Sequence, residues 1–202
     1  MILPLSLAYA QTSTDGSIVL NGQIDLHLSS ANVNTNVTNA VGNVTGTSAA
    51  VGNNLEVVTM NNANVTNNQF VTSVSISADQ NAAVTNVGGT TTLQSQAICN
   101  AADVSTDPHT TAVYSSQVCD ANDPSALLNA TVTNAGNDVS LSSQAVGNSF
   151  SEDTNAANMP TQNYQTNASN IASTVNAKVT NVSGNVTVNS TAIGNNAQIV
   201  QY

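Results

Sequence analysis

The chain has 202 residues, of which 6% are charged and 3% aromatic, and its formal net charge is −10. Lys178 is the only Lys or Arg, so the basic surface that phosphate contacts require is missing, which excludes nucleic-acid binding. The same lack of cations argues against docking on an anionic membrane surface, and no stretch approaches the roughly 20 apolar residues of a membrane span.

The first element is residues 1–10, MILPLSLAYA, a short apolar run that ends in Ala-Tyr-Ala. A run of this kind before a small-x-small site is typical of the end of a secretory signal peptide. We therefore predict an exported protein, with residues 1–10 as the remnant of a signal peptide and residues 11–202 as a single domain. The alternative is that residues 1–10 form a buried apolar strand.

From Ile18 onward the chain is a repeat. Each unit opens with a segment that is often Val-Thr-Asn. An Ala-x-x-Asn segment, whose first residue lies thirteen residues after the first residue of the unit, closes it. Four strong copies begin 47, 48 and 47 residues apart, and weaker copies between them divide the chain into units of 19 residues. Every second unit, except the last, is followed by nine or ten further residues. The eight units begin at Ile18, Val37, Val65, Val84, Val113, Val132, Pro160 and Val179.

Apolar and polar residues alternate at period two within the units, as in residues 71–76 and 186–188, which is typical of β-strands. A short unit that cannot bury a face alone, repeated many times, indicates a solenoid. We predict an all-β fold, a β-solenoid of about eight coils with one 19-residue unit in each coil. The alternative winding takes the full 47 residues as one wide coil.

The closing Asn is present in every unit. If equivalent residues stack from coil to coil, each side-chain amide can donate to the carbonyl of the next and satisfy the whole column. We therefore predict one continuous structural ladder of eight amides. Its members are Asn34, Asn53, Asn81, Asn100, Asn129, Asn148, Asn176 and Asn195.

The extra residues after the even units combine apolar residues with carboxylates. We predict that they form loops on one edge of the solenoid and contact a partner, since loops carry much of protein recognition. The alternative is an ordinary solvated loop. The candidate contact residues are Leu55, Glu56, Val57, Asp103, Val104, Phe150 and Glu152.

Cys99 and Cys119 are the two cysteines of the chain and lie 20 residues apart. In an exported protein this spacing favours one disulfide, which would close the extra segment of the fourth unit. His27 and His109, the only histidines, share no ligand spacing with the cysteines, so we predict no zinc site.

The sequence holds none of the nucleophile, phosphate-binding or dinucleotide-binding motifs of common enzyme families. We predict no catalytic residue, no metal and no cofactor. Two other functions on the same scaffold remain open. One is a polysaccharide-processing enzyme built on the carboxylates of the extra segments, and the other is an ice-binding protein that uses the column of Thr residues.

The Ala-Val-Gly-Asn and Ala-Ile-Gly-Asn segments at residues 50–53, 145–148 and 192–195 resemble the repeats of holdfast attachment proteins of stalked alphaproteobacteria, which are curli-like surface proteins. The resemblance implies an outer-membrane-associated protein at the cell surface that anchors adhesive polysaccharide or assembles into amyloid-like fibres.

Together these patterns predict a secreted, structural or adhesive β-solenoid without catalytic activity. The last unit ends in Tyr202 without a polar cap, so we expect an open sheet edge there. The predicted partners are further copies stacked end to end, other surface-anchor proteins, and polysaccharide.

Overall fold

The computed structural model describes residues 9–13, 16–59, 63–72, 74–106, 112–155 and 159–202. Every regular element among them is a β-strand. The strands form three sheets, and within each sheet the strands of the repeat pair in parallel. The all-β solenoid that the sequence predicts is therefore confirmed.

The strands follow one another in a fixed order through the three sheets. Sheet A contains β1 (Tyr9–Ser13), β2 (Gly16–Asp25), β5 (Ala63–Thr72), β8 (Ala112–Asp120) and β11 (Thr161–Asn167). Sheet B contains β3 (Ser29–Ala40), β6 (Ile76–Val87), β9 (Ser125–Ala135) and β12 (Ala172–Val182). Sheet C contains β4 (Val44–Thr59), β7 (Thr91–Thr106), β10 (Val139–Thr154) and β13 (Val186–Gln201).

One coil is therefore one strand from each sheet, and β2 to β13 make four coils. Stacked partners such as Asn34 and Asn81 lie 47 residues apart. The prediction of eight 19-residue coils is wrong, and the 47-residue winding is correct. The reason is strand length, because β3 has 12 residues and β4 has 16, so one 19-residue unit spans little more than a single strand and cannot close a turn of the solenoid.

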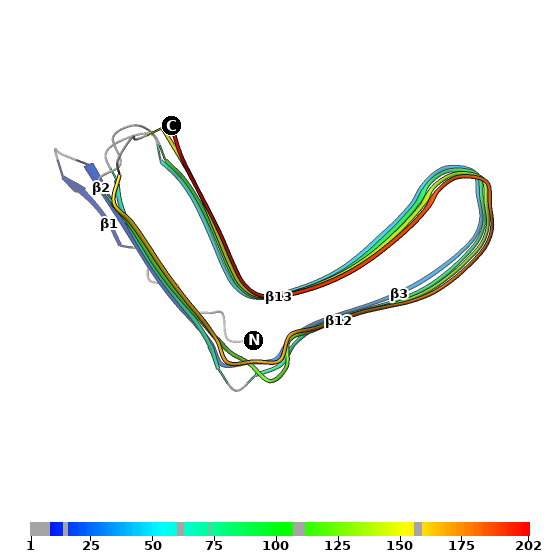
Figure 1. Ribbon diagram of the computed structural model, residues 1–202, viewed down its shortest axis with the longest axis horizontal. Coiled ribbons are helices and arrows are strands. Elements are labelled where there is room, and N and C mark those ends of the chain that lie inside the picture. The colour runs from blue at the N-terminus through cyan, green and yellow to red at the C-terminus, as the bar shows by residue number, and fades with distance from the viewer. Residues whose placement is uncertain (1–8, 14–15, 60–62, 73, 107–111, 156–158) are drawn as a thin grey trace.

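Viewed along the stack, each coil has the outline of a V (Figure 1). Sheet C bends at mid-strand, so that its first half packs against sheet B and its second half against sheet A. The apolar cluster of the B–C arm includes Leu93 and Val132, and that of the A–C arm includes Val65 and Phe150. A third cluster, at the bend that we call the elbow, contains small residues such as Ala97.

The two ends of the solenoid differ in how far their edges are covered. At the first coil β1 pairs antiparallel with β2, and β1 begins at Tyr9. Residues 1–8 of the predicted signal-peptide remnant lie outside the described residues. In the pairing of the described strands, β3 and β4 are the last strands of sheets B and C at this end, and β11, β12 and β13 are the last strands at the other.

Candidate functional site

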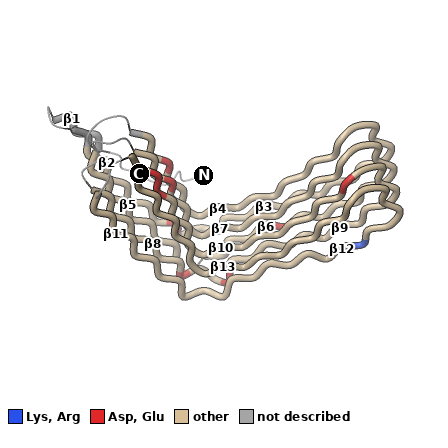
Figure 2. The backbone as a smooth tube through the Cα atoms, turned by 45° about the horizontal axis from the view of Figure 1, so that its top comes forward, with Lys and Arg blue, Asp and Glu red and all other residues tan. Residues whose placement is uncertain are grey.

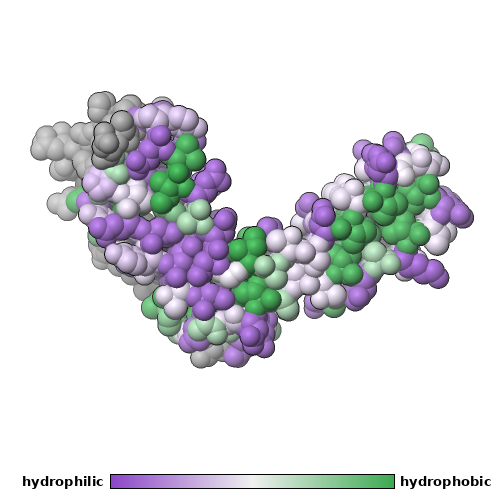
Figure 3. Space-filling model, viewed as in Figure 1, coloured by the Kyte–Doolittle hydropathy of each residue, from purple (hydrophilic) through white to green (hydrophobic). Residues whose placement is uncertain are grey.

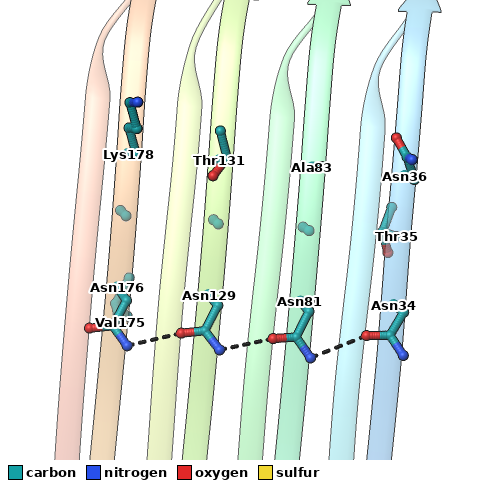
Figure 4. Close-up of a pocket in the computed structure, with 13 residues that line it drawn as sticks. Asn34, Thr35, Asn36, Asn81, Ala83, Asn129, Thr131, Val175, Asn176 and Lys178 are labelled. Atoms are coloured by element: carbon teal, nitrogen blue, oxygen red, sulfur yellow. Dashed lines mark hydrogen bonds between the residues drawn. The ribbon is translucent and has the colours of Figure 1, made fainter.

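The eight closing asparagines form two ladders instead of one. The first ladder lies on the exposed face of sheet B, where neighbouring amides are joined by Nδ2 to Oδ1 bonds of 2.8–3.1 Å (Figure 4). Its members are Asn34, Asn81, Asn129 and Asn176. The single eight-rung ladder is a wrong prediction because residues 19 apart fall on different sheets of the same coil.

The second ladder is at the elbow, where the amides of sheet C are joined at 2.7–2.9 Å. Asn100 is fully buried, and its Nδ2 also donates to the carbonyl oxygen of Val118 in sheet A at 2.9 Å. The amides therefore bind sheet C to sheet A as well as coil to coil. The members of this ladder are Asn53, Asn100, Asn148 and Asn195.

Two further amide ladders were not predicted from the sequence. A Gln ladder runs through sheet A, with Nε2 to Oε1 distances of 2.8–3.0 Å. A ladder of corner asparagines stands where sheet B ends, and each of them has a positive φ between 54° and 60°. Asn tolerates this left-handed conformation better than most residues do. The ladders are Gln23, Gln69, Gln117 and Gln165, and Asn39, Asn86, Asn134 and Asn181.

The signal for these two ladders was present in the sequence as recurrence at 46 to 48 residues. The 19-residue unit concealed it, because glutamine does not recur at that shorter distance. The corner asparagines are the Asn of the Val-Thr-Asn segment, which marks the start of a unit in the sequence.

The predicted disulfide is present at the elbow. Cys99 of β7 and Cys119 of β8 are bonded, with their Cα atoms 5.9 Å apart, so the bond joins sheets C and A of successive coils. The first coil has Gly52 at the bend, where an added Cβ would lie 2.7 Å from the carbonyl oxygen of Cys99. The elbow therefore accepts either no side chain or one that is bonded across it.

The extra segments of the even units are not loops, and that prediction is wrong. They are the second halves of β4, β7 and β10, and they complete the A–C arm. Val57, Val104, Phe150 and Glu152 are buried there, and Leu55 is half-buried. Successive side chains of a strand point to opposite faces, so the arm requires apolar residues only at alternate positions. This alternation explains the mixture of apolar residues and carboxylates from which the sequence predicts a contact loop.

Glu56 and Asp103 do point outward, and they are paired across β4 and β7. Their contact with a partner stays a prediction. Glu152 points inward, in the same column as Val104 and Ile199. Burial raises the pKa of this carboxyl, although its Oε1 accepts a hydrogen bond of 2.8 Å from Thr161.

Two grooves follow the stacking axis on the outer faces. The first, with a volume of about 760 Å³, crosses sheet B beside its amide ladder, where Asn36, Ala83, Thr131 and Lys178 form the neighbouring column (Figure 4). Lys178, the only cationic side chain of the chain, stands at the fourth-coil end of that column (Figure 2).

The second groove, of about 560 Å³, lies on the outer face of sheet A. It is lined from the floor by Gly22, Asn68 and Ser116 and from one side by Phe70. None of the residues that line it is charged. This groove was not predicted, because the sequence alone does not show which residues 46 to 48 apart share an outer face.

The described residues contain no group of three or more His, Cys, Asp or Glu that could hold a metal ion. His27 belongs to the turn after β2, while His109 lies outside the described residues. The Thr column contains Thr38, Thr85, Thr133 and Thr180 and forms a single row on sheet B. Among the described strands, the residues two positions before it are the mixed column of the sheet B groove, so the row lacks a second Thr row there.

The ends of the stack expose apolar surface that the inner coils bury. Figure 3, which looks along the stack, shows hydrophobic residues on the end face in both arms. Val186, Val188 and Ile199 of the last strand are 46–47% exposed, whereas Leu141, the partner of Val188 in the third coil, is fully buried.

These features define a parallel β-solenoid whose candidate functional surfaces are its grooves and open ends. The family model for holdfast attachment protein D matches residues 37–201, which is most of the chain. The chain belongs to this family, and its role is in holdfast attachment at the cell surface. No curated protein and no solved structure matches it.

Among the described residues the structure contains no helix long and apolar enough to cross a membrane.

Proposed function

We propose that the chain is an exported, noncatalytic structural element that assembles end to end and anchors adhesive polysaccharide in the holdfast. The observation that carries this proposal is the match between the two open ends of the solenoid. The following features of the described residues support it.

The amide ladders end in complementary groups. In the sheet B ladder each Nδ2 donates toward the first coil, so Asn34 ends with a donor and Asn176 with an acceptor. In the elbow ladder the direction is reversed, because each Nδ2 donates toward the fourth coil. Asn53 therefore ends this ladder with an acceptor at the first coil, and the amide group of Asn195 ends it at the fourth coil. A second copy stacked in register on the fourth coil would therefore continue both ladders with the same bond direction.

The charges of the two ends are also compatible. The fourth coil, residues 161–202, contains no Asp or Glu and carries Lys178, whereas the first coil carries Asp25 and Glu56. Extending the observed register by one coil places Gln198 of one copy beside Glu56 of the next, since Gln198, Ser151, Asp103 and Glu56 share one column. No carboxylate would face another across the junction.

Natural sheets protect their edges with charges, prolines or bulges. Strands β12 and β13 together carry one charged residue, Lys178, and no proline. At the first coil β1 covers β2, so the stacking proposed here uses β3 and β4 of one copy and β12 and β13 of another. This is a head-to-tail contact, which produces an open filament when it is repeated.

Sedimentation velocity over a range of concentrations tests the assembly. We expect the wild-type chain to form a concentration-dependent series of oligomers, and Val188→Lys to remain monomeric because its charge would be buried at the junction. Thr191→Lys is the matched control, since Thr191 belongs to the same strand but to a column on the outer face of sheet C. A wild-type chain that stays monomeric at high concentration, with no thioflavin signal, contradicts the proposal.

The anchoring role is tested in cells that lack the protein. We expect the wild-type gene to restore firm attachment of the adhesive, and Val188→Lys to leave the adhesive shed into the medium. Release of oligosaccharides from polysaccharide by the purified chain would contradict a noncatalytic role.

A further inference from the structure

The aromatic residues of this chain are few, and they gather on one surface. Of four Tyr and two Phe in the sequence, three lie on the outer face of sheet A. Phe70 is 37% exposed, Tyr114 39% and Tyr164 67%. Each belongs to a different coil, so together they extend over the second, third and fourth coils. Exposed rings that cluster in this way mark an interaction surface.

Phe70 lines the groove of sheet A, and the other two rings lie on the same outer face next to residues of its lining or its floor column. The floor of the groove is the column Gly22, Asn68, Ser116, and the next residue of that column, Tyr164, closes it at the fourth coil. A Cβ added at Gly22 would meet no atom within 4 Å, so the floor is open at the first coil.

Two columns of the outer face flank the floor of the groove. Ile24, Phe70 and Val118 line one side, and the column on the other side of the floor, which is outside the lining, is Leu20, Thr66, Tyr114 and Gln162. The groove therefore combines an apolar side that includes an aromatic ring with an amide and a hydroxyl on the floor, and two further aromatic rings lie close by on the same face.

This combination suits a sugar polymer. A pyranose ring has a face of C–H bonds that packs on an aromatic ring, whose face is electron-rich, and an edge of hydroxyl groups that needs hydrogen-bonding partners. The lining contains no charged side chain, so an acidic peptide, a nucleic acid or an anionic glycan finds no counter-charge there.

We propose that the sheet A groove is the site that binds polysaccharide, and that its ligand is a neutral glycan chain lying along the stacking axis. Phe70, Tyr114 and Tyr164 contact the sugar rings, while Asn68 and Ser116 hydrogen-bond with hydroxyl groups. The groove of sheet B is the weaker candidate, since its ladder amides already bond with one another and no aromatic residue lines it. This inference rests on the proposed role in anchoring polysaccharide.

Electrophoresis of the purified chain through gels that contain a soluble polysaccharide tests the proposal. The probes are hydroxyethyl cellulose, a neutral β-linked glucan; dextran, a neutral α-linked glucan; and alginate, an acidic glycan. We expect at least one neutral glucan to retard the wild-type chain, and alginate to leave its mobility unchanged. Tyr114→Ala and Tyr164→Ala should each weaken the retardation about three- to ten-fold.

Two further variants separate the groove from general effects on folding. Gly22→Leu places an apolar side chain on the floor at a position where its Cβ meets no atom of the fold within 4 Å, and we expect it to reduce retardation at least as strongly as the loss of a ring. Tyr202→Ala removes an exposed Tyr outside sheet A, at the end of the chain after β13, and should bind like the wild type.

Retardation by neither neutral glucan, retardation by alginate alone, or equal retardation of the groove variants and the wild type would each overturn the assignment. A changed sedimentation profile in Tyr164→Ala would also overturn it, because the face would then be a contact between protein chains. Val188→Lys should still be retarded, so a failure of end-to-end assembly is distinguishable from a failure of the groove.

Discussion

The two inner coils and the two end coils of this solenoid have nearly the same sequence pattern but different surroundings. Val84 and Val132 of the inner coils are fully buried, whereas Val37 and Val179, in the same column of the end coils, are only partly buried. An inner coil has a neighbour on each side that covers its column, and an end coil has one. The contribution of a residue to stability therefore depends on the position of its coil in the stack.

The largest expected effect comes from truncating side chains within one column of the stack. Leu141→Ala removes a fully buried side chain, and we expect a loss of about 2–5 kcal/mol in the free energy of unfolding. Val188→Ala, in the register partner that is 47% exposed, should cost less than about 1 kcal/mol in dilute solution. Urea unfolding measures both. Equal losses in the two variants would show that the end coil is buried as deeply as the inner ones.

The elbow disulfide belongs to the inner coils and gives the second test. Its removal in the double variant Cys99→Gly and Cys119→Val should lower stability by about 3 kcal/mol, through the freedom that the unfolded chain regains. Gly and Val are the residues found at these positions in other coils, Gly52 and Val71, so the bend itself is retained. Unfolding of the wild type with and without a reductant is the control, and an unchanged midpoint would contradict this account.

The elbow ladder offers a smaller, more local comparison. Asn100→Ala leaves the Oδ1 of Asn148 and the carbonyl oxygen of Val118 without their donor in a buried site, which should cost about 1–3 kcal/mol. Asn195→Ala removes an exposed rung and should cost about 0.5 kcal/mol or less. Thermal unfolding of the two variants at low concentration measures the difference. A similar loss at both positions would mean that burial of the rung does not set its contribution.

The smallest expected effect is a pH dependence from Glu152. Because burial raises the pKa of this carboxyl, the folded state holds its proton more tightly than the unfolded chain does. The stabilisation is complete at pH values below the ordinary carboxyl pKa, and it is lost as the pH rises through the raised value. Glu152→Gln should therefore flatten the profile of stability between mildly acidic and neutral pH. Asp153→Asn, at the exposed neighbour, should leave the profile unchanged.

Much of the fold could be predicted from the sequence because β-structure leaves a period-two pattern and a repeat leaves a fixed spacing. The family followed from short segments such as residues 50–53. The disulfide followed from two cysteines 20 residues apart. These signals are local, so they can be interpreted without knowing which strands are neighbours.

The winding of the chain was decided only by the tertiary structure. Asn34 and Asn53 occupy the same place in two adjacent 19-residue units, yet one is on the open face of sheet B and the other is buried at the elbow. Sequence periodicity shows that two segments are alike, but it does not show that they stack, because stacking requires the chain to return to the same point after a full turn. Here that return takes 46 to 48 residues, and it alone determines which amides form ladders, which carboxylates are buried and which aromatic rings share an outer face.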